Sequence, residues 1–164
     1  YTIVYRRGAE AFVKRAREAG FDGLIVPDLA FEEADDLAEI GRAHDCPLVM
    51  MVAPTSDAGR RQRIAEISEP FIYYQSVAGV TGERTQLPQD LIDQVRRLRA
   101  DSGKPVCVGF GISTPAQVRS VCSVGDGAIV GSAIVRRITA AIENGQRGEQ
   151  IAEVVARFVD ELSA

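Results

Sequence analysis

The chain has 164 residues, of which 46% are hydrophobic and 26% are charged, and its formal net charge is −4. This is the composition of a single globular domain, long enough to bury a real core. Basic residues never occur more than two in a row, so no nucleic acid is expected as a partner. A small phosphorylated ligand remains compatible with the acidic charge, because backbone amides can bind an anion locally.

Cysteine and histidine usage argues against a metal site. Cys46, Cys107 and Cys122 have no CxxC spacing, and we expect them to be small buried thiols in a reducing, cytoplasmic environment. His44 is the only histidine and cannot build a zinc site alone. The longest apolar runs are strand-sized, so neither a membrane span nor a membrane partner is expected.

Short apolar runs, nearly continuous rather than alternating, predict strands of a parallel sheet that is buried on both faces. The predicted strands cover residues 24–27, 48–52, 71–75, 105–109 and 127–130.

Segments with helical periodicity separate these strands and flank them. Pro115 is placed in a first helical turn behind Ser113 or Thr114 as N-cap, and Gly20 and Gly103 can end helices in a left-handed conformation. Alternating strands and helices predict an α/β fold with a parallel sheet. The clearest helical stripes lie in residues 8–19, 31–40, 91–98, 118–122 and 151–162.

Two architectures fit this order: an open, doubly wound sheet, and part of a (β/α)₈ TIM barrel. Length favours the open sheet, because a whole barrel takes about 250 residues. The opening favours the barrel: residues 1–7 are expected to be a strand end or loop that leads directly into a helix, as if the chain began inside a βα unit. We therefore predict one partial barrel domain, residues 1–164, with the C-terminal five βα units present and the N-terminal three absent.

Two strand ends in the last third carry glycines and lead into helices. The strand at 105–109 continues into Gly109-Phe110-Gly111, and the strand at 127–130 continues into Gly131-Ser132, where a short extra helix over 132–138 is expected. Glycine allows close approach of a ligand, and the free amides of a first helical turn attract anions. Two such turns side by side predict a phosphate site, as in many barrels. The alternative is that these glycines only make tight turns.

Three further features lie on the same predicted edge. Segment 77–84 is glycine-rich and predicts a lid, the alternative being a loop without function. Tyr73 and Tyr74 are consecutive in a strand, so one should point into the barrel and the other toward the helices. Asp28 follows the first strand, and could either face a ligand or partner or cap the helix at Phe31.

Five segments together resemble the tryptophan synthase alpha chain family, in the family's order and at close to its spacing over the whole chain. SVAGVTG combined with the two glycine turns is the most specific part of the resemblance. The segments are IVPDL at 25–29, APTS at 53–56, SVAGVTG at 76–82, GFGIST at 109–114 and VGSAIV at 130–135.

The resemblance implies a carbon–carbon lyase of tryptophan biosynthesis, which cleaves indole-3-glycerol phosphate to indole and glyceraldehyde 3-phosphate. It implies no cofactor in this chain and a beta subunit as partner, where pyridoxal phosphate condenses indole with serine. The residues that would bind the substrate phosphate are Gly82, Phe110, Gly111, Gly131 and Ser132.

The same resemblance assigns the pocket and the interface. Tyr1 and Tyr73 would line the substrate pocket, and Thr81 would close the lid and orient a catalytic carboxylate. The Asp28 loop and the lid would face the beta subunit. This chain has Ala30 where the family usually has proline, which could loosen the loop that meets the partner.

No catalytic residue is assigned within these residues. The family's general acid/base and the carboxylate that binds the indole nitrogen belong to the three absent units, and proton transfer needs such a group. Carboxylates at 32–36 and at Glu83 are no substitutes. We therefore expect this chain alone to be inactive. We also expect it to aggregate or dimerise through its two unpaired edge strands.

Two other functions remain open. Another phosphate-binding barrel enzyme, such as a relative of indole-glycerol-phosphate synthase, would carry catalytic lysines at strand ends, but Lys14 lies in a helix and Lys104 precedes a strand. A non-catalytic phosphate-binding fragment or assembly module would need no acid/base at all.

Overall fold

The computed structural model describes residues 1–76, 89–109 and 111–163. Within these ranges no helix is long and apolar enough to cross a membrane. The strands are β1 (Leu24–Ile25), β2 (Leu48–Val49), β3 (Met51–Val52), β4 (Ile72–Gln75), β5 (Val106–Gly109) and β6 (Gly127–Ile129). The helices are α1 (Thr2–Arg7), α2 (Ala9–Glu18), the 3₁₀ turn η1 (Phe31–Glu33), α3 (Asp35–Ala43), α4 (Ala58–Ile67), α5 (Gln89–Ser102), α6 (Pro115–Cys122), α7 (Ser132–Glu143) and α8 (Glu149–Ser163).

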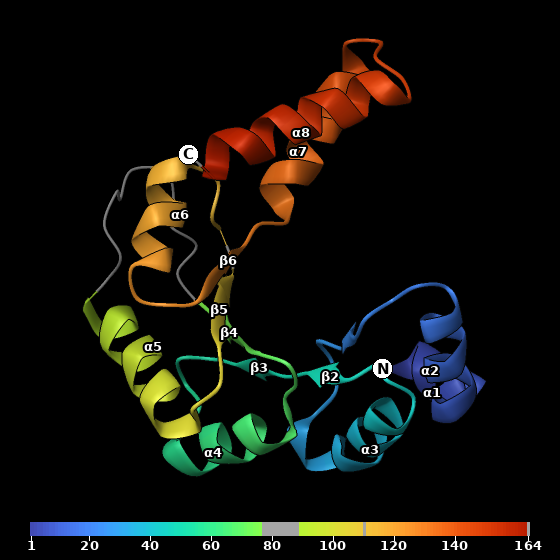
Figure 1. Ribbon diagram of the computed structural model, residues 1–164, viewed down its shortest axis with the longest axis vertical. Helices are drawn as coiled ribbons and strands as arrows, with labels where there is room; N and C mark the ends of the chain where they lie inside the picture. The colour runs from blue at the N-terminus through green and yellow to red at the C-terminus, as the bar shows by residue number, and fades with distance from the viewer. Residues whose placement is uncertain (77–88, 110, 164) are drawn as a thin grey trace.

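The described strands are parallel and follow one another in chain order. β1 pairs with β2, and β3, β4, β5 and β6 pair in sequence. Figure 1 shows them following an arc, with α3, α4, α5 and α6 along its outer side. The doubly wound alternative requires a switch in strand order, and none occurs among the described strands. The predicted parallel order of five strands is confirmed, with the second strand divided into β2 and β3.

The division of the second strand has a local cause at Met50. Its amide donates to the hydroxyl of Ser68 at 2.8 Å, while its carbonyl accepts from the amide of Tyr73 at 3.0 Å. Ser68 is fully buried and also donates to the carbonyl of Phe71 at 2.6 Å. One serine side chain therefore replaces a strand neighbour at Met50 and joins the end of α4 to the sheet.

The opening of the chain differs from the prediction. Residues 2–7, expected as a strand end or loop, form α1, with Tyr1 as its N-cap. Gly8, at φ 80°, separates α1 from α2. A six-residue helix that buries only Val4 has no repeating apolar stripe, so periodicity could not reveal it. The extra helix α7 also extends beyond the expected residues 132–138, to Glu143.

Alternate residues of the strands face opposite sides of the arc, as in any strand. The outward side chains pack with the helices into the main core, which includes Leu48, Val52, Ile72, Tyr74 and Val108. The other set lies outside that cluster and faces the concave side of the arc. We call this set the concave face: Ile25, Val49, Met51, Tyr73, Gln75, Cys107, Gly109, Gly127 and Ile129.

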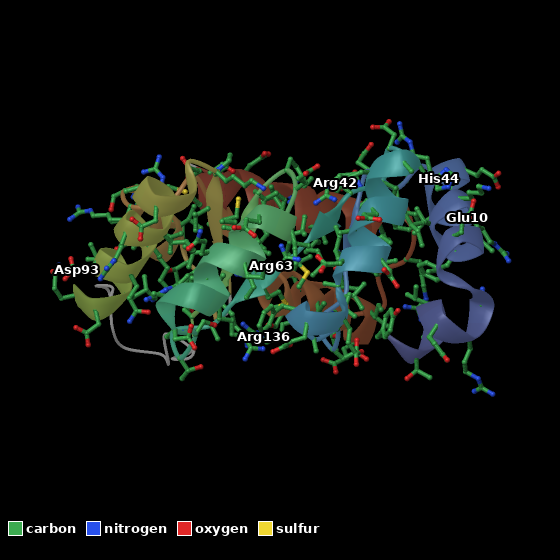
Figure 2. The ribbon with its side chains drawn as sticks, turned by 90° about the horizontal axis from the view of Figure 1, so that it is seen from below. Glu10, Arg42, His44, Arg63, Asp93 and Arg136 are labelled. Atoms are coloured by element: carbon green, nitrogen blue, oxygen red, sulfur yellow. The ribbon has the colours of Figure 1, made fainter. Side chains whose placement is uncertain are left out.

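Ion pairs join neighbouring helices on the outer surface. Arg63 of α4 donates to both carboxylate oxygens of Asp35 in α3, at 2.7 and 2.6 Å. His44, at the C-cap of α3, lies 3.5 Å from the carboxylate of Glu10 in α2, and both are labelled in Figure 2 with Arg63. Such exposed pairs contribute little to stability individually, so the order of the helices depends mainly on the core.

The cysteines are all free but only one fits the expected buried role. Cys46 is fully buried, Cys107 is half-buried on the concave face, and Cys122 is exposed. The expectation is wrong for Cys122, which is exposed at the end of α6. Burial raises the pKa of the Cys46 and Cys107 thiols.

The two tyrosines of β4 separate as predicted. Tyr74 is fully buried against the helices and donates to Oε1 of Gln94 in α5 at 2.8 Å. Tyr73 lies on the concave face, over Gly109 of the adjacent strand. A Cβ on Gly109 would come within 2.8 Å of Cε1 of Tyr73, and closer still to its hydroxyl. Glycine at 109 is therefore required for the ring to lie flat across β5.

Replacing Gly109 with alanine should force Tyr73 away from β5 and lower the free energy of unfolding by about 1–3 kcal/mol, the usual cost of overpacking. Urea unfolding measures this change. Tyr73→Ala in the same chain should remove most of the added cost, because the clashing ring is gone. Gly59→Ala in α4 is the control, because the added Cβ would meet only Oδ1 of Asp57 among the described atoms, at an ordinary contact distance of 3.5 Å. If Gly109→Ala lowered the free energy of unfolding equally in the presence of Tyr73 and of Tyr73→Ala, the packing argument would be contradicted.

Candidate phosphate and substrate site

The C-terminal ends of β4, β5 and β6 form one edge. Gln75 is in register with Gly109, and Gly109 with Ile129. Gly111 and Gly131 each lie two residues beyond these aligned strand ends. Because adjacent strands are about 4.8 Å apart, the two glycines occupy equivalent positions at neighbouring strand ends. The sequence prediction of two adjacent glycine turns is consistent with this register.

The N-terminus of α7 is open. Gly131 is its N-cap, without a side-chain cap, and its carbonyl accepts from the amides of Ile134 at 2.9 Å and Val135 at 3.1 Å. Within the described ranges, no acceptor is paired with the amides of Ser132 or Ala133. A Cβ on Gly131 would meet no described atom within 4 Å, so packing among the described residues does not explain glycine there. The free amides and the helix dipole make this end suited to an anion.

The N-terminus of α6 is closed, which differs from the expectation of two free helix ends. Thr114 accepts from the amide of Gln117 at 3.3 Å, and Oε1 of Gln117 accepts from the amides of Ser113 at 2.8 Å and Thr114 at 3.2 Å. This capping box satisfies the amides that an anion would need. The exposed Gly111, at φ 77°, remains as the backbone position on this side.

The start of the predicted lid is anchored at the same edge. Ser76 is buried, and both its amide (3.1 Å) and its hydroxyl (3.2 Å) donate to the carbonyl of Gly109. Beyond it, the lid 77–84 with Thr81 and Gly82 lies outside the described residues, as does Phe110. Tyr73 lies below this edge on the concave face, and burial raises the pKa of its hydroxyl.

Asp28 lies in the exposed loop that follows β1. It does not cap the turn at Phe31, because the N-cap of η1 is Ala30 and no side chain caps it. Its carboxylate accepts a hydrogen bond from the backbone nitrogen of Tyr1. Tyr1 is thus beside the β1 loop instead of at a strand end. Leu29 is buried and fixes the loop to the core.

Arg60 makes a contact that no sequence motif indicated. Its guanidinium lies 4.5 Å from the centre of the Phe31 ring, a cation–π contact between α4 and the turn after the Asp28 loop. A sequence signal for such a pair is lacking, since the two residues are far apart in the chain. The contact holds the loop against α4.

A hollow of about 280 Å³ lies at this end of the arc and is bordered by the β1 loop, the β3 loop and the end of β4. It brings residues of the IVPDL and APTS segments together. Among the described residues, its polar lining consists of Thr55, Ser56, Gln75 and Arg60 and includes no carboxylate. Within the described part of the chain no group of histidine, cysteine and acidic residues could hold a metal ion. These side chains can hydrogen-bond a ligand, but none shuttles a proton near neutral pH.

Comparisons with known proteins agree with this geometry. The profile of the family described as "Tryptophan synthase alpha chain" matches residues 1–163. Alpha chains of Rhodopirellula baltica and Opitutus terrae are 49% and 42% identical, over 89% and 100% of this chain. The matched part covers 52% and 60% of those proteins. The chain therefore spans somewhat more than half the length of these relatives.

Solved structures show the same relationship. A structure of the tryptophan synthase a2b2 complex from Pyrococcus furiosus gives a TM-score of 0.85 at 32% identity, over 99% of this chain and 63% of that one. The alpha chain from Legionella pneumophila gives 0.82 at 29% identity, over 99% and 60%. The family match over nearly every residue and the shared barrel arc lead to one conclusion: the chain belongs to the tryptophan synthase alpha chain family.

Proposed function

We propose that these residues form the phosphate-binding part of an indole-3-glycerol phosphate lyase of tryptophan biosynthesis. The observation that carries the proposal is the uncapped N-terminus of α7 beside Gly111, at the C-terminal edge of the arc. This is the end of a barrel where substrates bind. The reaction would release indole and glyceraldehyde 3-phosphate.

The substrate phosphate would be held mainly by backbone. The amides of Gly131 and Ser132 would donate to it from α7, and the turn at Gly111 would approach from the other side, with Phe110 and Gly82 completing the site. Tyr73, on the concave face, would line the indole-glycerol part with Tyr1. Thr81 would close the lid over the bound substrate. The open space above Gly131 supports this arrangement, because a side chain there would fill it.

The proton-carrying carboxylates would come from polypeptide outside these residues. None of the described concave-face residues is acidic. Asp126, just before β6, is engaged with Arg99 at 2.6 Å and with the amide of Val106 at 2.9 Å. Three further N-terminal βα units would complete an eight-stranded barrel with these five. The longer relatives support this division.

A beta subunit is the proposed partner, and pyridoxal phosphate would belong to that subunit, with no cofactor in this chain. The Pyrococcus furiosus neighbour comes from an a2b2 complex. The exposed Asp28 loop, supported by buried Leu29 and the Arg60–Phe31 contact, would face the partner together with the lid. The assembly would work in the cytoplasm.

Gly131→Val should abolish binding of glycerol phosphate without unfolding the chain. Its φ of −120° is accessible to valine and a Cβ meets no described atom, so the added side chain would block only the space above the α7 amides. Calorimetry measures binding, and circular dichroism checks the fold. Ala140→Val, at an exposed position of the same helix, should bind as the unchanged chain does. Retained binding in Gly131→Val would refute the assignment.

The chain alone should release no measurable indole from indole-3-glycerol phosphate. Removing a general acid/base typically costs 10²–10⁴-fold in rate, even where positioned donors remain. Joining the upstream βα units of a relative should restore turnover, measured by indole release. Restored turnover would also exclude a purely non-catalytic phosphate-binding module. Full turnover by the short chain would mean that one of its own carboxylates transfers the proton.

The unpaired edges of β1 and β6 should make the isolated chain associate. Each of these strands has a described neighbour on one side only, and exposed edges template pairing with another chain. Sedimentation velocity should show dimers or larger species at micromolar concentration, and a chain completed with the upstream units should not form them through these edges. A strictly monomeric short chain would contradict this expectation.

A further inference from the structure

Gln75, the last residue of β4, places a neutral amide on the concave face. It lies two residues beyond Tyr73 on the same side of the strand, and in register with Gly109 of β5. Among the described residues of the concave face, only Tyr73 and Gln75 have a side chain with an oxygen or nitrogen atom. Gln75 is therefore the polar group of this face that lies nearest to the C-terminal edge.

The side chain of Gln75 is half-buried and has no protein partner in the described part of the chain. It lines the hollow of about 280 Å³ between the β1 loop, the β3 loop and the end of β4. Val26, Pro27 and Met51 are apolar residues that line the same hollow. No described residue forms a hydrogen bond with the Gln75 amide. A ligand that displaces water from the hollow would leave this amide unpaired, unless the ligand supplies polar groups of its own.

The register places Gln75 between the two ends of the proposed substrate. The phosphate would lie at Gly111 and Gly131, each two residues beyond the level of Gln75, or roughly 7 Å along an extended chain. The indole would lie deeper, toward Tyr73. The part of the substrate at the level of Gln75 is therefore the three-carbon chain between indole and phosphate, whose polar atoms are hydroxyl groups.

From this placement we infer that Gln75 hydrogen-bonds a hydroxyl group of the glycerol chain and so determines specificity for a hydroxylated phosphate ester. The inference rests on the proposed function and adds a residue to the same site. An amide suits this role, because its NH₂ group donates to a hydroxyl oxygen and its carbonyl accepts the hydroxyl proton. An analogue without the hydroxyl leaves the amide unpaired, and such a site discriminates against it.

Calorimetry on the 164-residue chain compares glycerol 3-phosphate with propyl phosphate, which has the same carbon chain and phosphate but no hydroxyl group. Glycerol 3-phosphate should bind about tenfold more tightly, the size of effect expected for one hydrogen bond made away from water. Gln75→Leu should remove this preference: the Kd for glycerol 3-phosphate should rise about tenfold, and the Kd for propyl phosphate should stay unchanged.

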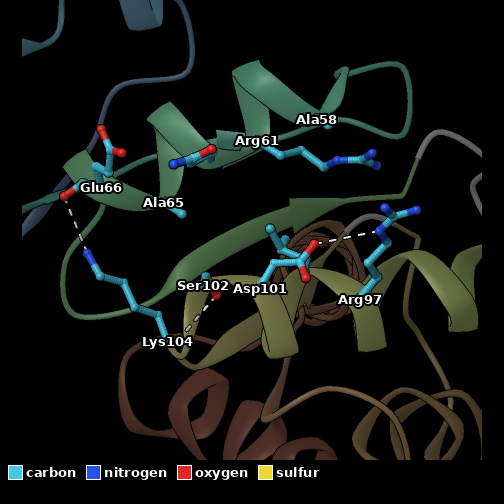
Figure 3. Close-up of a pocket in the computed structure, with 10 residues that line it drawn as sticks. Ala58, Arg61, Ala65, Glu66, Arg97, Asp101, Ser102 and Lys104 are labelled. Atoms are coloured by element: carbon cyan, nitrogen blue, oxygen red, sulfur yellow. Dashed lines mark hydrogen bonds and ion pairs between the residues drawn. The ribbon is translucent and has the colours of Figure 1, made fainter.

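Gln62→Leu is the matched control. Gln62 is exposed on α4 and lines a separate hollow of about 520 Å³ between α4 and α5 (Figure 3). This hollow shares no lining residue with the proposed phosphate site, so the same substitution there should leave both Kd values unchanged. Circular dichroism checks folding, and Gln75→Met, with an unbranched side chain of similar length, replaces Gln75→Leu if that variant unfolds.

Gly131→Val separates this inference from the phosphate assignment, because it should abolish binding of both probes. Equal binding of the two probes by the unchanged chain, or an equal loss of both in Gln75→Leu, would overturn the role of Gln75 while the phosphate assignment stands. A preference that disappears in Gln75→Leu but persists in Gly131→Val would support Gln75 and reject the assignment at α7. Absence of binding of either probe would overturn both.

Discussion

The backbone hydrogen bonds that hold β4, β5 and β6 in parallel register are the constraint on which the rest of the structure depends. They align the strand ends at Gln75, Gly109 and Ile129, and so bring the turns at Gly111 and Gly131 to one edge. They also decide which tyrosine of β4 faces the concave side of the arc and which faces α5. A shift of one residue would exchange these faces.

Helix capping distinguishes the two glycine turns, because one leads into a capped helix start and the other into an uncapped one. The capping box of Thr114 and Gln117 satisfies the start of α6 internally, whereas α7 begins at Gly131 with its amides unpaired in the described structure. A helix end that caps itself is a structural anchor, and one that does not is available to a ligand. The turn at Gly111 therefore leads into a helix start that is fixed by its own side chains, and the turn at Gly131 leads into one whose amides are available to a ligand.

Sequence reasoning succeeded where a pattern has a direct physical cause. Continuous apolar runs marked the buried strands, and Pro115 behind Thr114 marked the capped start of α6. It failed where tertiary contacts decide: α1 is short and buries only Val4, and the break at Met50 depends on the hydroxyl of Ser68. The Arg60–Phe31 contact arises because folding brings α4 against the turn η1, so no local sequence pattern predicts it.

The sequential order of the strands also bears on how the molecule reaches its native state. Apart from β2 and β3, the two parts of the divided strand, described strands that are consecutive in the chain pair with each other. The outer core between sheet and helices is built from the same consecutive units. Loop closure for such neighbours is inexpensive in entropy, and local contacts favour rapid folding. The outer layer can thus assemble unit by unit, as each strand and the helix that covers it are added.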